Sequence, residues 1–138
     1  MSTSIRRINP PTLSTPRGYT HIVEARPGRT AYISGQVPLD TEGKLVGLGD
    51  LEAQTDRVFV NLRAALAAVG GNFVHVVKIT IFVATAITPE SISTIRAVRD
   101  RHIDPEDLPA SSLLQVVALY LPNVLIEIEA IAVIPDAS

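Results

Sequence analysis

An apolar segment near the end of the chain, residues 124–134 (VLIEIEAIAVI), contains two carboxylates. Side chains of an extended strand alternate between two faces, so Glu127 and Glu129 share one face with Ile131, while the other face is apolar throughout. Both faces must therefore be covered, one by helices of the same chain and the other by something else, most simply a second subunit. A covered face that carries two carboxylates is a candidate site for proton chemistry.

The composition is typical of a compact soluble protein. Of 138 residues, 46% are hydrophobic and 19% are charged, so we expect one domain, residues 1–138, with a single core. The formal net charge is −2, with three Tyr, three Phe and no Trp, a balance that argues against nucleic-acid binding. No stretch reaches the roughly 18 apolar residues of a membrane span, and the N-terminal residues have no signal-peptide core. A cytoplasmic protein without membrane contact is predicted.

The chain offers little metal or cofactor chemistry. Cysteine is absent, which excludes disulfides, thiol nucleophiles and thiolate metal sites. The histidines, His21, His75 and His102, are isolated from one another and from carboxylate clusters, so no metal site is predicted. Nothing in the sequence implies a cofactor.

Hydrophobic periodicity and turn residues divide the chain into six strands and two helices in the order βββαβαββ. The predicted strands cover residues 5–8, 21–25, 29–37, 75–84, 112–119 and 124–134, and the predicted helices cover 51–69 and 89–102. Pro27-Gly28 predicts a hairpin between the second and third strands. The predicted fold is α+β, a six-stranded mixed sheet with both helices on one face. The opposite face then needs a partner, and closed rotational assemblies are the usual solution.

Five segments stand in an order and spacing typical of one known family. They are Gly18-Tyr19, residues 32–40 (YISGQVPLD), the helix at 54–70 with Asn61-Leu62, Val76-Val77-Lys78, and residues 109–133 (PASSLLQVVALYLPNVLIEIEAIAV). With these segments, which span almost the whole chain, the sequence resembles the RidA/YjgF family of reactive-intermediate deaminases. The resemblance implies a chorismate-mutase-like fold, a homotrimer, and a small-molecule ligand in each cleft between neighbouring subunits.

One position departs from this resemblance. In family members that hydrolyse imines, an arginine follows the Pro-Ala pair and binds the substrate carboxylate through two hydrogen bonds. Ser111 follows Pro109-Ala110 here, and serine supplies neither a charge nor a two-pronged donor. The chain is therefore similar to a branch of the family that lacks the substrate-binding arginine. For such a branch the resemblance implies the trimer but not the deaminase activity.

Five residues are candidates for the small-molecule site. By resemblance, Glu127 matches the glutamate that orients the attacking water, and Tyr19 matches a tyrosine that borders the cleft. Gly35 permits a close backbone approach to a ligand or a β-bulge, and Ser111 offers a hydroxyl or an amide. Arg17, two residues before Tyr19, is a cation that would replace the missing arginine. Each has a structural alternative: for Glu127, an acid bound to backbone or to an arginine of the next subunit.

Two functions are consistent with these residues. The first is a RidA-like hydrolase of the enamine or imine deaminase type, acting on C=N bonds, with Glu127 positioning water and a substrate altered because Ser111 replaces the arginine. The second is a non-catalytic trimeric module that binds a small metabolite or a protein partner. Of the nearby charges, Glu129 is expected in an interface ion pair, and Lys78 is expected to extend to solvent or to pair with a glutamate.

Overall fold

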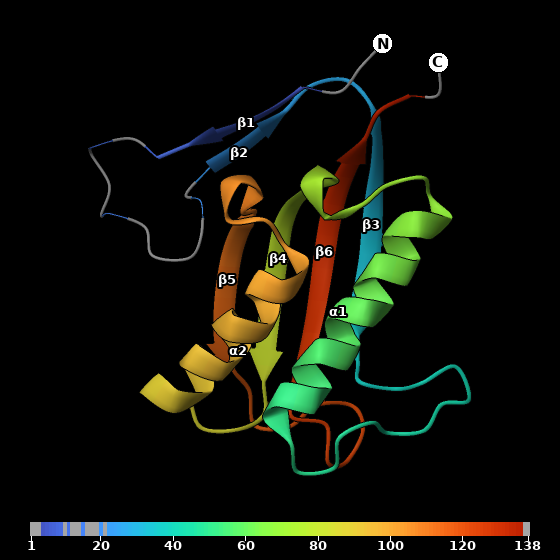
Figure 1. Ribbon diagram of the computed structural model, residues 1–138, viewed down its shortest axis with the longest axis vertical. Helices are drawn as coiled ribbons and strands as arrows, with labels where there is room; N and C mark the ends of the chain where they lie inside the picture. The colour runs from blue at the N-terminus through green and yellow to red at the C-terminus, as the bar shows by residue number, and fades with distance from the viewer. Residues whose placement is uncertain (1–3, 10, 12–14, 16–19, 21, 137–138) are drawn as a thin grey trace.

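The computed structural model describes residues 4–9, 11, 15, 20 and 22–136 (Figure 1). Its elements follow the predicted order βββαβαββ, which confirms the α+β class. Short 3-10 helices, η1 (Phe73–His75) and η2 (Pro105–Asp107), precede the fourth and fifth strands. The strands are β1 (Ile5–Ile8), β2 (Ile22–Ala25), β3 (Arg29–Gln36), β4 (Val76–Val83), β5 (Ala110–Gln115) and β6 (Ile126–Ile134), and the helices are α1 (Leu51–Ala68) and α2 (Pro89–His102).

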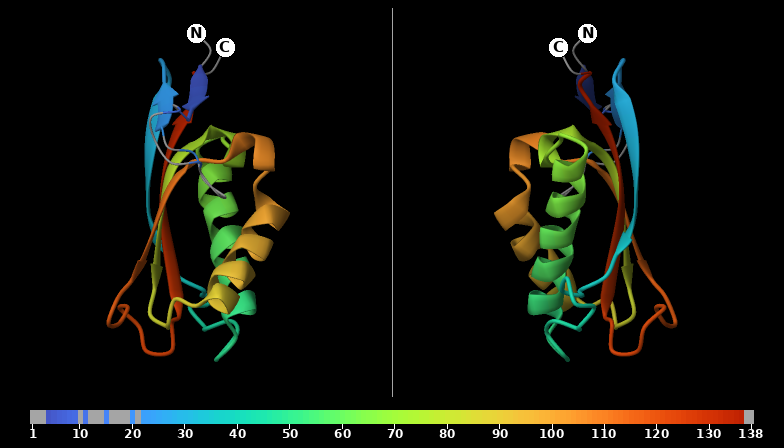
Figure 2. Two further views of the ribbon diagram at one scale, coloured as in Figure 1. Left: turned by 90° about the vertical axis from the view of Figure 1, so that its left-hand side faces the viewer. Right: turned by 90° about the vertical axis from the view of Figure 1, so that its right-hand side faces the viewer.

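The main sheet has four strands in the order β3-β6-β4-β5. Strands β4 and β5 are parallel, and α2 lies in the connection between them, while β6 pairs antiparallel with both β3 and β4. Both helices pack on one face of this sheet, as predicted, and leave the other face bare (Figure 2). In the described part of the chain, neither helix has the length and hydropathy needed to cross a membrane.

The predicted six-stranded sheet and the hairpin at Pro27-Gly28 are corrected by the structure. Strand β2 pairs with β1 in a separate two-stranded sheet, and β3 pairs with β6. The chain does bend at Pro27-Gly28, but it leaves the bend in a new direction, and β1 and β2 cross above one end of the main sheet (Figure 1). A Pro-Gly pair determines only a local turn. The strand that pairs with the eight-residue β3 is determined by the long apolar strand β6, which offers backbone hydrogen bonds and side-chain contacts along its length.

The core lies between the helices and the covered face of the sheet. The alternation predicted for β6 is confirmed, since Ile126, Ile128, Ala130 and Ala132 are all buried. Helix α1 contributes a stripe of fully buried side chains to the same core: Val58, Phe59, Leu62 and Leu66. This packing holds β6, the strand that carries both glutamates, in the interior of the sheet.

The helix boundaries follow from their capping residues. The Asp50 side chain accepts a hydrogen bond from the Ala53 N–H at 3.1 Å, and Thr88 caps α2 with Ser91 in a reciprocal capping box. Pro89 occupies the start of α2, where its missing N–H costs no hydrogen bond. Helix α1 ends before Gly70, whose φ of +78° is readily adopted only by glycine.

A histidine with a largely buried side chain ties the two helices together. His102 Nε2 lies 2.7 Å from Asp56 Oδ1, and Arg63 Nη2 lies 2.6 Å from His102 Nδ1. Because a guanidinium only donates, Nδ1 is the acceptor, and the proton on Nε2 is directed to Asp56. The imidazole also stacks on Phe59, with ring centroids 5.3 Å apart. His102 is therefore a structural residue of the helix layer.

Candidate active site

The bare face of the main sheet carries the two carboxylates that the sequence singles out. Glu127 lies beside Phe82 of β4, and Glu129 lies beside Thr80. Glu129 is exposed, as are the large apolar side chains of Tyr32 (79% exposed) and Leu114 (44%) that flank the glutamates. We call this surface the open face, defined by Tyr32, Lys78, Thr80, Phe82, Ser112, Leu114, Glu127 and Glu129.

Gly35 and Glu127 come into direct contact. A Cβ atom added at Gly35 would lie 2.0 Å from Oε1 of Glu127, so the carboxylate occupies the space that any other residue would fill. The register between β3 and β6 also shifts between Ile33 and Gln36, where β3 accommodates an extra residue. The bulge predicted at Gly35 is confirmed, and the space beside its backbone is occupied by the Glu127 side chain, while a contact between Gly35 and a ligand stays a prediction. The glycine seats the Glu127 carboxylate against the backbone of β3.

The surroundings of Glu127 change its proton affinity. Burial of the half-buried carboxyl is the main cause that raises the pKa of Glu127 above its ordinary value, and the negative charge of Glu129 raises it further. A carboxylate of higher pKa is a stronger base, which suits it to take a proton from a bound water. In the part of the chain that the structure describes, no group of three or more metal-binding side chains gathers here or elsewhere.

Lys78 supplies a positive charge on the open face. Its Nζ donates to Ser112 Oγ at 2.9 Å in an exposed hydrogen bond, and among the described residues it forms no ion pair. This position agrees with extension toward solvent, one of the two expectations for Lys78. At about 3.3 Å per residue, Lys78 lies roughly 13 Å along β4 from Phe82, the neighbour of Glu127. Alternation along β5 places Ser112 on this face, on the same side as Leu114.

Ser111 lies away from the two glutamates. It is in register with Ile79, a buried core residue, so its side chain alternates toward the helix layer, and β4 separates its strand from β6. Its role in ligand binding stays a prediction. The candidates Arg17 and Tyr19 lie outside the described residues. Thr20, which is described, donates its N–H to the Pro109 carbonyl at 3.2 Å, at the start of β5.

Gln54 was missed by the sequence analysis, yet it supports the site. This fully buried side chain donates to the carbonyls of Gly47 and Asn123, each at 3.0 Å, and accepts from the Leu125 N–H at 2.8 Å. It thus fixes the backbone where the chain enters β6, two residues before Glu127. A polar residue in an amphipathic helix pattern suggests a surface position, so no local signal identified Gln54.

Known proteins share both the sequence pattern and the fold. A profile of the family described as Endoribonuclease L-PSP matches residues 12–134. Protein DfrA of Myxococcus xanthus is 37% identical over 115 residues, 83% of this chain and 84% of that protein. The 3-aminoacrylate deaminase RutC of Acinetobacter baylyi is 34% identical over 101 residues, 73% of this chain and 76% of that one.

The fold comparison agrees with the sequence comparison. The crystal structure of YyfB from Yersinia pestis, a protein of the conserved Rid family, superposes with a TM-score of 0.83 at 38% identity, covering 94% of this chain and 98% of YyfB. Because the family profile spans most of the chain and these relatives match over most of their own length, the chain belongs to the RidA/YjgF family.

Proposed function

We propose that this protein is a homotrimeric hydrolase of the imine or enamine deaminase type, with a small-molecule site in each cleft between subunits. The observation that carries the proposal is the Glu127 carboxylate, held against Gly35 on the sheet face that the helices leave bare. A neighbouring subunit over the open face would cover Tyr32 and Leu114 and enclose the carboxylate. A relative named as a 3-aminoacrylate deaminase lends support to this class of reaction.

Imine hydrolysis needs one base that activates a water molecule beside the carbon of the C=N bond. Glu127 takes a proton from water as the oxygen forms a bond to this carbon, and the proton then passes to the nitrogen. The carbinolamine so formed then gives up its hydroxyl proton, which Glu127 transfers to the nitrogen as the C–N bond breaks, so that imine and water give a carbonyl compound and ammonia. Glu127 returns to its ionised form without a net change.

The substrate differs from that of family members with the arginine. Ser111 carries no charge, and the Lys78 amine on the open face is bonded to Ser112. We therefore expect a small imine or enamine whose binding does not depend on a two-pronged carboxylate contact. Arg17 remains the candidate for a replacement cation.

The proposal is tested by measuring ammonia release. Purified protein should accelerate the hydrolysis of enzymatically generated 3-aminoacrylate or 2-iminobutyrate above the rate in buffer, and it should sediment as three copies. A folded monomer, or a trimer that accelerates no imine or enamine of a graded series, would contradict it.

The alternative is a non-catalytic module that uses the same surface. The missing charge at Ser111 favours it, because a site without an anchor for the substrate carboxylate has lost a main contact for catalysis on amino-acid-derived imines. A metabolite that raises the melting temperature and is recovered unchanged would support this function. RNA cleavage, which the family description names, gains no support from a net charge of −2.

The raised pKa of Glu127 predicts a pH dependence of hydrolysis. Only the ionised carboxylate accepts a proton, so activity should fall as the pH decreases through a pKa that lies above the ordinary glutamate value. Replacing Glu129 by Gln removes the repulsive charge, lowers the pKa of Glu127 and should move the acidic limb to lower pH. A kcat/KM profile of both proteins measures this shift. An unchanged limb in E129Q would show that Glu129 does not act on the titrating group.

Adding a methyl group at Gly35 should lower the activity and leave the stability of the fold nearly unchanged. Gly35→Ala places a Cβ 2.0 Å from Oε1, 2.7 Å from Cδ and 2.9 Å from Cγ of Glu127, so the half-buried glutamate side chain must turn to another rotamer, at little cost in folding free energy. We expect kcat to fall at least about tenfold, a loss of some 1.4 kcal/mol of transition-state stabilisation. The urea midpoint should change little. Full activity in the folded variant would show that the seated position of the carboxylate is not needed.

A further inference from the structure

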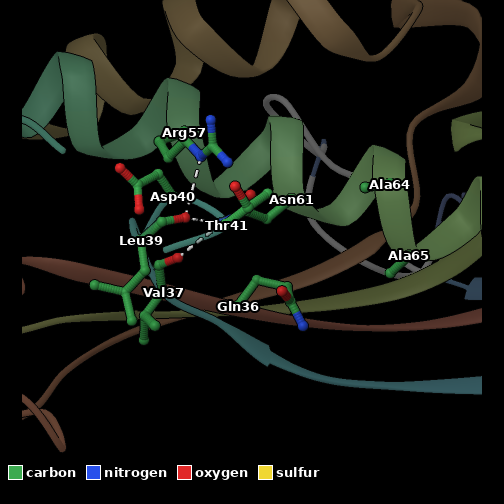
Figure 3. A pocket seen from close by; sticks show the side chains of 9 residues that line it. All are labelled: Gln36, Val37, Leu39, Asp40, Thr41, Arg57, Asn61, Ala64 and Ala65. Atoms are coloured by element: carbon green, nitrogen blue, oxygen red, sulfur yellow. Dashed lines mark hydrogen bonds between the residues drawn. The ribbon is translucent and has the colours of Figure 1, made fainter. Parts of the chain in front are cut away.

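A second cleft lies on the helix side of the sheet, away from the open face (Figure 3). It has a volume of ≈ 490 Å³ and is formed between α1 and the segment that follows β3. This volume falls within the range of small-molecule sites, roughly 300–1,000 Å³. Its lining residues are Gln36, Val37, Leu39, Asp40, Thr41, Arg57, Asn61, Ala64 and Ala65.

Arg57 lines this cleft, and only one nitrogen of its guanidinium donates a hydrogen bond to a described residue. Its Nε donates to the Leu39 carbonyl at 3.1 Å, which holds the half-buried guanidinium in place (Figure 3). Among the described residues it forms no ion pair, and its two terminal amino groups donate no hydrogen bond. A positioned guanidinium with free terminal donors fits a carboxylate through two parallel hydrogen bonds.

Two acceptors lie in the same cleft. Both hydrogen atoms of the Asn61 amide are directed to the backbone, because Nδ2 lies 2.9 Å from the Val37 carbonyl and 2.9 Å from the Leu39 carbonyl. The Asn61 side-chain oxygen is then left as an acceptor. Asp40 Oδ1 accepts from the N–H groups of Glu42 and Lys44, each at 2.9 Å, which fixes a carboxylate at the cleft without neutralising it.

We propose that this cleft is a second ligand site, which binds a small zwitterion of the α-amino acid class. Arg57 takes the ligand carboxylate, while Asp40 and the Asn61 oxygen take its ammonium group. A short apolar side chain of the ligand lies against Leu39 and Ala65. Asp40 disfavours a ligand that is only anionic, and Arg57 disfavours one that is only cationic, so the pair selects for both charges in one molecule. This site is independent of the hydrolase proposed above.

The probes that test this site are L-alanine, propionate and ethylamine, titrated into the isotope-labelled full chain. L-Alanine should shift the NMR signals of the Asn61 side-chain amide and the Ala64 and Ala65 backbone amides. Propionate and ethylamine, which each lack one charge, should bind at least tenfold more weakly. Equal affinity for propionate and L-alanine would overturn the zwitterion assignment.

Charge-neutral variants assign the two halves of the site. Arg57→Gln should abolish the L-alanine shifts, whereas Arg101→Gln, which removes an exposed arginine that pairs with Glu52, should leave them intact. Asp40→Asn keeps the oxygen that accepts from the backbone, so the loop should stay folded. This variant should weaken L-alanine at least tenfold and leave propionate unweakened. L-Alanine binding that survives in a folded R57Q, or that is lost in E127Q, would place the ligand elsewhere and overturn the proposal.

Discussion

Replacing Glu127 by Gln is expected to lower kcat for imine or enamine hydrolysis by about 100- to 10,000-fold, the usual contribution of a positioned general base. Glutamine keeps the shape of the side chain and its place against Gly35, but it cannot accept a proton from water. KM should change much less than kcat, because the lost interaction acts in the transition state. Steady-state ammonia release by both proteins measures the effect.

Glu129→Gln is the matched control for this variant. It removes a carboxylate from the same strand and the same face, but from an exposed position beside Thr80 instead of the seat at Gly35. At a pH above the acidic limb its kcat should remain within a few-fold of the parent. If E127Q and E129Q lose equal activity, the effect is one of surface charge, and a water-positioning role for Glu127 is wrong.

Replacing Gln54 by Ala is expected to lower the free energy of unfolding by about 3–4 kcal/mol. The change leaves a cavity beside the core and removes the three part-buried hydrogen bonds that the Gln54 amide makes with the backbone of Gly47, Asn123 and Leu125. Each lost hydrogen bond of this kind costs roughly 0.5–1.5 kcal/mol, and the cavity adds to the loss. Urea unfolding followed by far-UV circular dichroism measures the loss.

Two further variants separate cavity from hydrogen bonding. Gln54→Leu fills most of the volume but still strands the three backbone groups, so it should stay close to Gln54→Ala in stability. Gln115→Ala, at an exposed glutamine that makes one long contact with the Ile87 N–H (3.4 Å), should cost within about 0.5 kcal/mol. Full recovery of stability in Q54L would show that packing and not hydrogen bonding accounts for the effect.

Much of the fold could be read from local patterns. Period-two alternation assigned the buried face of β6 correctly, because side-chain direction in a strand follows from backbone geometry alone. The starts predicted for the helices at residues 51 and 89 agree with the structure, because the capping residues Asp50 and Thr88 act on N–H groups only three residues away. The glycine of β3 was likewise a local signal, and it marked the bulge; its contact with Glu127, 92 residues away, was decided by the pairing of β3 with β6.

Other features depend on distant parts of the chain. The bend at Pro27-Gly28 did not reveal that β2 would pair with β1, and the pattern of α1 did not reveal that Gln54 would hold Leu125, 71 residues away. Nor did the departure from the family pattern at Ser111 show that its neighbour Ser112 would share the open face with Lys78.

The sequence by itself determined the elements, their order, and the placement of two carboxylates on one face of an apolar strand, because propensity, capping and alternation act over a few residues. Tertiary structure alone decided which strands pair, which polar groups meet in the interior, and that Arg57 would project beside Asp40 into a second cleft. These outcomes follow from burying apolar surface and satisfying polar groups across the whole chain at once, which no local segment encodes.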